Sequence, residues 1–97
     1  MKEADVEKAA SVFNALGNPT RLRILTLVSE TDRPLHIMAV AKALDLDYAA
    51  LYRHVRILKD RGLLEVYDVG RSRVLIIKDA EPLRQIVETA NKMKQYR

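Results

Sequence analysis

The 97-residue chain lacks cysteine, has only three glycines and contains no long hydrophobic run. Without cysteine it can form neither a disulfide framework nor a thiolate metal site. Its longest apolar runs span a few residues, far fewer than the roughly 20 that a membrane-spanning helix needs. The glycines, Gly17, Gly62 and Gly70, are scattered, so there is no glycine-rich phosphate-binding loop. Length and composition then predict one globular domain, residues 1–97.

Reactive side chains are also few. No nucleophile is paired with a base in a recognisable motif, so we expect no enzymatic activity. The two histidines, His36 and His54, have no second metal ligand at a useful spacing, and there is no HExxH motif. We therefore predict neither a metal nor another cofactor. We expect His54 to be a partly buried, hydrogen-bonded residue of the fold.

Charge is distributed unevenly along the chain. The net charge of +4 is only a mild bias toward anionic partners. From Arg53 to Arg73, however, there are six cationic residues and only three acidic ones, so the excess is concentrated in one segment. We find no secretory signal in the first residues, MKEADVEKAASVF, because acidic and basic groups alternate there without a long apolar stretch. This favours a cytoplasmic location.

Hydrophobic spacing predicts a mainly α-helical chain with one β-hairpin. Gly17 and Pro19 are expected to end the first helix, Asp47 to cap the fourth helix at its start, and Gly62 to end it. The predicted helices cover residues 3–16, 20–29, 35–44, 48–61 and 80–97, and the predicted strands cover residues 63–69 and 73–78. The order α-α-α-α-β-β-α is that of a winged helix-turn-helix with an extra helix at each end.

The helix predicted for residues 48–61 has two different faces. At about 100° per residue, one side carries apolar residues and a histidine: Leu51, His54, Val55 and Leu58. The opposite side carries small, aromatic and cationic residues: Ala49, Tyr52, Arg53 and Arg56. One face can pack in a core while the other remains outside. No acidic side chain interrupts the segment from Tyr48 to Lys59, which favours a helix that enters a DNA groove.

The N-terminal half of such a helix contacts base edges. Arg53 could pair bidentately with a guanine, and Tyr48 and Tyr52 could contact a phosphate or a thymine methyl group. Ala49 would let the backbone approach closely, while residues further along would meet phosphates. The predicted DNA contacts on this helix are Tyr48, Ala49, Tyr52, Arg53, Arg56 and Lys59. Taken alone, the same residues would also fit an ordinary solvated cationic face.

The predicted hairpin has a basic tip. Gly70, Arg71 and Ser72 form its turn, and Arg73 follows directly. Two arginines beside a glycine suit a wing that reaches phosphates or a minor groove, so we predict DNA contacts for Arg71, Ser72 and Arg73. By itself this tip would fit a polar turn. Its presence in the same chain as the basic helix favours duplex DNA as the partner.

The terminal helices predict self-association. Residues 3–16 carry an apolar face, and the last helix carries apolar residues at spacings of 3, 4 and 3: Leu83, Ile86, Ala90 and Met93. Such a narrow seam suits packing against another helix. Pairing these helices across a two-fold axis would bury both faces, so we expect a homodimer. The alternative is that they fold back onto their own domain.

Three stretches of the chain carry a resemblance to a known family. They are LGNPTRLRIL, Leu16–Leu25, then AVAKALDLDYAALYRHVRILKDRGLLEV, Ala39–Val66, and VGRSRVLII, Val69–Ile77. In that order, they resemble the second-helix signature, the helix-turn-helix and the wing of the ArsR-type winged-helix repressors. The resemblance covers about residues 6–90, although each part also occurs in related winged helices such as the MarR type. It implies a homodimeric repressor that binds a palindromic operator.

The chain departs from that family at the sensor positions. Metal-responsive members carry cysteine pairs in the helix before the turn, or carboxylate and histidine ligands on the last helix. Here Leu35–Leu44 contains no cysteine and Ala80–Arg97 contains no histidine, so the resemblance does not extend to metal sensing. Arg53 stands where histidine is frequent in such repressors, which leaves the target sequence open.

Two other classes of function remain open from the residues alone. A winged helix can serve as a protein-interaction module of transcription or repair machinery, and it would then show no sequence preference on DNA. A small-ligand sensor could use the cleft of a dimer, but no residue in the sequence marks such a pocket.

Overall fold

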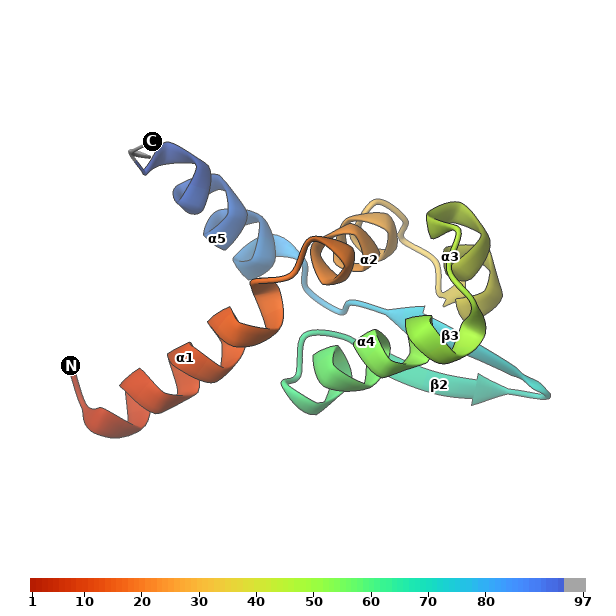
Figure 1. Cartoon of the computed structure of the whole chain (residues 1–97), viewed down its shortest axis with the longest axis horizontal. Helices are drawn as coiled ribbons and strands as arrows, with labels where there is room; N and C mark the ends of the chain where they lie inside the picture. Colours follow the sequence, from red (N-terminus) through yellow and green to blue (C-terminus); the bar gives the residue numbers. More distant parts are fainter. Residues whose placement is uncertain (94–97) are drawn as a thin grey trace.

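The computed structural model describes residues 1–93 and confirms a winged helix-turn-helix with a small antiparallel sheet (Figure 1). In chain order, the elements are α1 (Glu3–Leu16), α2 (Pro19–Ser29), β1 (Leu35–His36), α3 (Ile37–Leu44), α4 (Tyr48–Asp60), β2 (Glu65–Val69), β3 (Ser72–Ile76) and α5 (Glu81–Lys92). The helices α2, α3 and α4 and the sheet form the body of the molecule, and α1 and α5 extend from one side of it (Figure 1).

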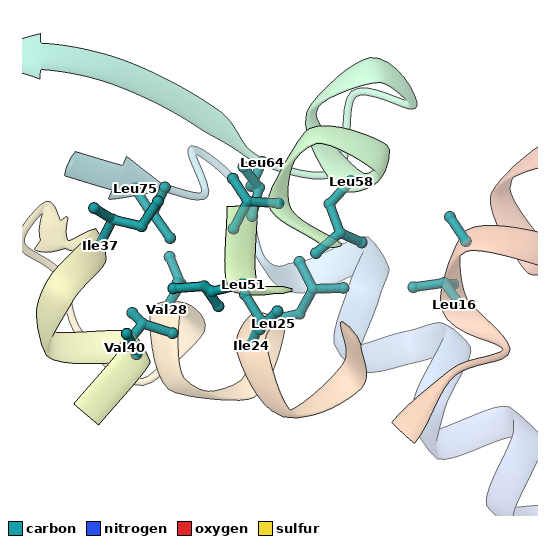
Figure 2. Close-up of a cluster of buried hydrophobic side chains, with 13 residues drawn as sticks. Leu16, Ile24, Leu25, Val28, Ile37, Val40, Leu51, Leu58, Leu64 and Leu75 are labelled. Carbon is teal, nitrogen blue, oxygen red and sulfur yellow. The ribbon is translucent and has the colours of Figure 1, made fainter. Parts of the chain in front are cut away.

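The hydrophobic core lies between α2, α3, α4 and the sheet (Figure 2). Each of these helices contributes apolar side chains at helical spacing. The largest fully buried side chains are Ile24, Leu25, Leu51, Leu58, Leu75, Val28, Val40 and Val55. Within residues 1–93 no polar or charged residue is buried, so hydrophobic burial is what holds these elements together.

The prediction of a helix from residue 35 is wrong at its first two residues. Leu35 and His36 form strand β1, which pairs antiparallel with β3 and places Leu35 opposite Leu75, so α3 begins at Ile37. The sheet therefore has three strands in the order β1-β3-β2. The backbone groups of β3 would otherwise be unpaired along that edge, and pairing them outweighs extending α3 by two residues.

Other element ends differ slightly from the sequence-based expectation. Helix α2 begins at Pro19, one residue early, because proline suits the first helical position and the Asn18 side chain accepts a hydrogen bond from the Arg21 amide at 3.1 Å. Helix α4 ends at Asp60, and α5 ends at Lys92 with Met93 in an extended conformation. The part of the last predicted helix at residues 94–97 lies outside the described residues.

A short turn sets the angle between α3 and α4. Asp45 has a φ of 53°, and its amide and that of Leu46 donate to the carbonyls of the last turn of α3. Two residues later, the Asp47 carboxylate accepts a hydrogen bond from the Ala50 amide at 2.8 Å and caps α4, as predicted. Gly62, with a φ of 73°, closes α4 in the same way. Both ends of the helix are therefore fixed by local hydrogen bonds.

The wing is a tight hairpin of β2 and β3. Its turn consists of Gly70 and Arg71, because Val69 already pairs with Ser72. Gly70 has a φ of 62°, which favours glycine over residues with a side chain and fits a two-residue turn that matches the twist of the strands. The resulting register places Asp68 directly opposite Arg73.

The terminal helices contribute little to the core. Helix α1 buries only Ala15 and Leu16, at its C-terminal end, and α5 buries no residue. The two helices leave the body at neighbouring points and diverge, so that the start of α1 and the end of α5 lie on the same side of the body (Figure 1). None of the helices within residues 1–93 is long and apolar enough to cross a membrane.

We expect Leu58→Ala to lower the free energy of unfolding by about 2–5 kcal/mol, because it leaves a cavity in a fully buried part of the core. The matched control is Met38→Ala, at a residue that is 52% exposed, and it should cost about 0.5 kcal/mol or less. Urea unfolding at one fixed protein concentration measures both. Similar losses for the two variants would contradict this description of the core.

Candidate DNA interface

The outward face of α4 carries cationic side chains that are exposed among the described residues, 1–93. On the opposite face Leu51, Val55 and Leu58 are fully buried, at 0% exposure, and His54 is half-buried. The exposed residues of the outward face are Ala49, Arg53, Arg56 and Lys59. Within residues 1–93 none of the three cationic side chains forms a hydrogen bond or an ion pair, so their charges are available to a ligand.

The wing lies beside the start of α4. Arg71 and Ser72 are exposed at its tip. Together with Tyr48 and Arg73 they line a hollow of about 530 Å³, which His36 and Met38 also border. The structure thus brings the predicted wing contacts next to the first residue of α4. It leaves Arg56 and Lys59 further along the helix, outside this hollow.

Arg73 and two tyrosines form a cluster that joins the wing to α4. The rings of Tyr48 and Tyr52 are stacked, with centroids 5.8 Å apart and planes within 6° of parallel. The Arg73 guanidinium carbon lies 4.6 Å from the centre of the Tyr52 ring, and its Nη1 donates to the Tyr48 hydroxyl at 3.0 Å. The Arg73 Nε also lies 3.5 Å from an Asp68 carboxylate oxygen. Electrostatic interaction with Tyr48, and then with Tyr52, raises the pKa of Arg73 above its ordinary value.

The segment from Arg53 to Arg73 contains three acidic residues, and two of them interact with other side chains. Glu65 lies 3.5 Å from the Lys78 ammonium and accepts a hydrogen bond from the Tyr67 hydroxyl. The Tyr67 hydrogen bond, and then the Lys78 charge, lower the pKa of Glu65, so this carboxylate stays ionised. Asp68 pairs with Arg73. Both acids lie on the wing, and neither neutralises the cationic side chains of α4.

Arg21 connects the end of α1 to α4 through His54. Its Nε donates to the Ala15 carbonyl at 2.6 Å and its Nη2 to the Asn14 carbonyl at 3.2 Å, while its Nη1 lies 3.4 Å from Nδ1 of His54. A guanidinium can only donate, so Nδ1 accepts and the ring proton of neutral His54 is on Nε2. Burial, followed by the charges of Arg21 and Arg53, lowers the pKa of His54. The half-buried, hydrogen-bonded histidine expected from the sequence is found.

Sequence reasoning missed the roles of Arg21 and Asp68. A signal existed for Asp68, because a two-residue turn at Gly70 and Arg71 places position 68 opposite position 73. No local signal existed for Arg21, whose partner His54 is 33 residues away in sequence.

No group of three or more histidine, aspartate and glutamate side chains within residues 1–93 is placed to hold a metal ion.

A helix-turn-helix of α3 and α4 followed by a β2–β3 wing defines the chain as a winged helix-turn-helix DNA-binding protein. A protein family described as a helix-turn-helix domain matches residues 16–67. An uncharacterised HTH-type transcriptional regulator of Methanocaldococcus jannaschii is 31% identical over 90% of this chain and 96% of its own length. The chain belongs to the ArsR-type winged helix-turn-helix transcriptional regulators, as its sequence resemblance indicated.

Solved structures share this fold. An ArsR-like transcriptional regulator from a Rhodococcus species has a TM-score of 0.72 and 27% identity, over 95% of this chain and 82% of that one. The crystal structure of a fragment of a possible transcriptional regulatory protein from Mycobacterium bovis has a TM-score of 0.81 and 25% identity, over 96% of this chain and 100% of that one. A solution structure of that fragment, described as a homodimeric winged helix-turn-helix DNA-binding domain, has a TM-score of 0.76 and 23% identity, over 100% of this chain and 95% of that one.

We expect His54 to make the free energy of unfolding fall as the pH is lowered below about 6.5, the ordinary pKa of histidine. In that range the unfolded chain binds a proton that folded His54, with its lowered pKa, does not bind. The variant His54→Asn keeps an acceptor for Arg21 but cannot titrate, so it should lose this part of the pH dependence. Urea unfolding at about pH 7.5 and 5.5 measures the difference.

His36→Asn is the matched control, because it makes the same substitution at the other histidine, which is exposed and has no hydrogen bond to Arg21 within residues 1–93. It should retain the fall in stability that His54 causes between the two pH values. An unchanged pH dependence in His54→Asn would show that His54 does not cause it.

Proposed function

We propose that the chain is a repressor that binds a palindromic operator as a homodimer, with α4 in the major groove and the wing beside it. The observation that carries the proposal is the cationic face of α4, which is exposed among residues 1–93 and lies opposite the fully buried Leu51, Val55 and Leu58. A helix fixed in this way can present its side chains to a groove without rearrangement. The resemblance to ArsR-type repressors supports the repressor role. We also propose a cytoplasmic location, where the protein would have access to DNA.

The contacts divide into two kinds. Arg53 is proposed to read a base edge, because it lies in the N-terminal half of α4 and its guanidinium has no partner within residues 1–93. Arg56 and Lys59 lie further along the helix and are proposed to meet phosphates, as is Arg71 at the wing tip. Tyr48, Ala49, Tyr52, Ser72 and Arg73 complete the proposed interface, where the start of α4 meets the wing.

The homodimer is supported by the apolar surface of the terminal helices. Phe13 on α1 is 57% exposed, Val87 on α5 is 37% exposed, and Met93 just after α5 is 67% exposed. A groove of about 820 Å³ lies between the end of α1 and α5, lined mainly by apolar side chains. Exposed apolar patches of this kind mark protein interfaces. The homodimeric Mycobacterium bovis domain with the same fold supports the same assembly here.

We expect the logarithm of the DNA affinity to fall linearly with the logarithm of salt concentration, because each phosphate contact releases counterions. Arg53→Ala should cost about 1–3 kcal/mol at one base position of the operator. Arg56→Ala is the matched control: it should weaken binding to all sequences alike and reduce the salt slope by about 1. Selection from a random DNA pool, followed by fluorescence anisotropy at several salt concentrations, measures these effects.

An enriched sequence with two-fold symmetry would support the proposal. A protein that enriches no sequence, or whose binding is independent of salt, would contradict it and would favour a protein-interaction module.

We expect Phe13→Glu to shift the chain from dimer to monomer, because it places a charge within the proposed interface. Val69→Glu is the matched control, since Val69 is 59% exposed but lies on strand β2 of the wing and not on α1 or α5. It should leave the dimer intact. Light scattering or sedimentation at micromolar concentration measures the mass. A dimer that survives Phe13→Glu, or a monomeric wild type, would be evidence against association through these helices.

A further inference from the structure

The two arginines of the wing differ in their surroundings. The Arg71 side chain has no hydrogen bond or ion pair within residues 1–93. Arg73 has three interactions: it donates to the Tyr48 hydroxyl at 3.0 Å, lies 4.6 Å from the centre of the Tyr52 ring, and lies 3.5 Å from Asp68. Two nitrogens of the Arg73 guanidinium, Nη1 and Nε, are therefore already engaged with Tyr48 and Asp68, whereas Arg71 has no such partner within the described residues.

We propose that Arg73 is a positioning residue for DNA recognition, which orients Tyr48 as a hydrogen-bond donor and fixes the wing against α4. This proposal rests on the proposed DNA-binding function. A phenol can both donate and accept, whereas a guanidinium can only donate. Because the Tyr48 oxygen accepts from Arg73, its own proton is left for an acceptor on the DNA, either a base edge or a phosphate oxygen. Tyr48 is 38% exposed and lines the hollow beside the wing tip.

The Tyr52 ring explains why an arginine is needed at position 73. Its stacking with Tyr48 holds the two rings nearly parallel, and the planar guanidinium can lie over one ring while its Nη1 reaches the hydroxyl of the other. Lysine carries the same charge, but it is a point donor on a flexible stem and lacks the planar fork. An Arg73→Lys variant therefore separates a requirement for charge from a requirement for geometry.

The experiment measures affinity for the selected operator and for an unrelated duplex, over a range of salt, for the wild type, Arg71→Gln, Arg73→Gln and Arg73→Lys. Arg71→Gln should weaken binding to both duplexes alike and reduce the salt slope by about 0.9, as expected for one lost phosphate contact. Arg73→Gln and Arg73→Lys should both keep the wild-type dependence of affinity on salt. Their preference for the operator over the unrelated duplex should fall roughly tenfold. Melting curves of each variant confirm that it is folded.

A double-variant cycle tests the route through Tyr48. If Arg73 acts by orienting that hydroxyl, Tyr48→Phe combined with Arg73→Gln should lose no more operator preference than the more affected single variant. Fully additive losses would overturn the proposal. So would a reduced salt slope in Arg73→Gln that Arg73→Lys restores, because that pattern identifies a phosphate contact.

Different results would overturn the DNA-binding function and the role of Arg73. A wild type that neither enriches a sequence nor responds to salt would overturn the DNA-binding proposal itself. A wild type that binds its operator as expected, with Arg73→Gln behaving like Arg71→Gln, would overturn only the role of Arg73.

Discussion

Burial of one side of α4 is the constraint on which the rest of the molecule depends. Leu51, Val55 and Leu58 are wholly buried against α2, α3 and the sheet, which fixes the rotation of α4 about its axis. Because opposite faces of a helix are rigidly related, the same packing that fixes these three side chains holds Arg53 and Arg56 outside. The core thus determines which side chains the helix offers to a partner.

The register of the wing completes this surface. A two-residue turn at Gly70 and Arg71 places Asp68 opposite Arg73, and neighbouring residues of a strand point to opposite faces of the sheet. A slip of one residue would move the Arg73 side chain to the other face and break its contacts with Tyr48 and Tyr52. The conformation of one glycine in the turn therefore bears on the arrangement of aromatic rings at the start of α4.

Local periodicity explains which features could be predicted from the sequence. The faces of α4 follow from the position of each residue around the helix, and the half-buried state of His54 follows from its place at the edge of the apolar side. Strand β1 could not be predicted, because it has only two residues, Leu35 and His36, which is too few to show an alternating pattern. They form a strand only by pairing with β3. The partners of Arg73 depend on packing between elements that are distant in sequence. The sequence alone could therefore show only that this side chain is positively charged.

The link from α1 to α4 bears on how a dimer would meet DNA. Two recognition helices related by a two-fold axis must lie about 34 Å apart to enter successive major grooves. If the terminal helices form the dimer contact, this spacing depends on how firmly each α4 is held relative to α1. Arg21 provides that connection, because one guanidinium bonds both to carbonyls of the last turn of α1 and to His54 on α4. Arg21 is therefore placed to preserve the spacing of the two recognition helices, on which recognition of a symmetric site would depend.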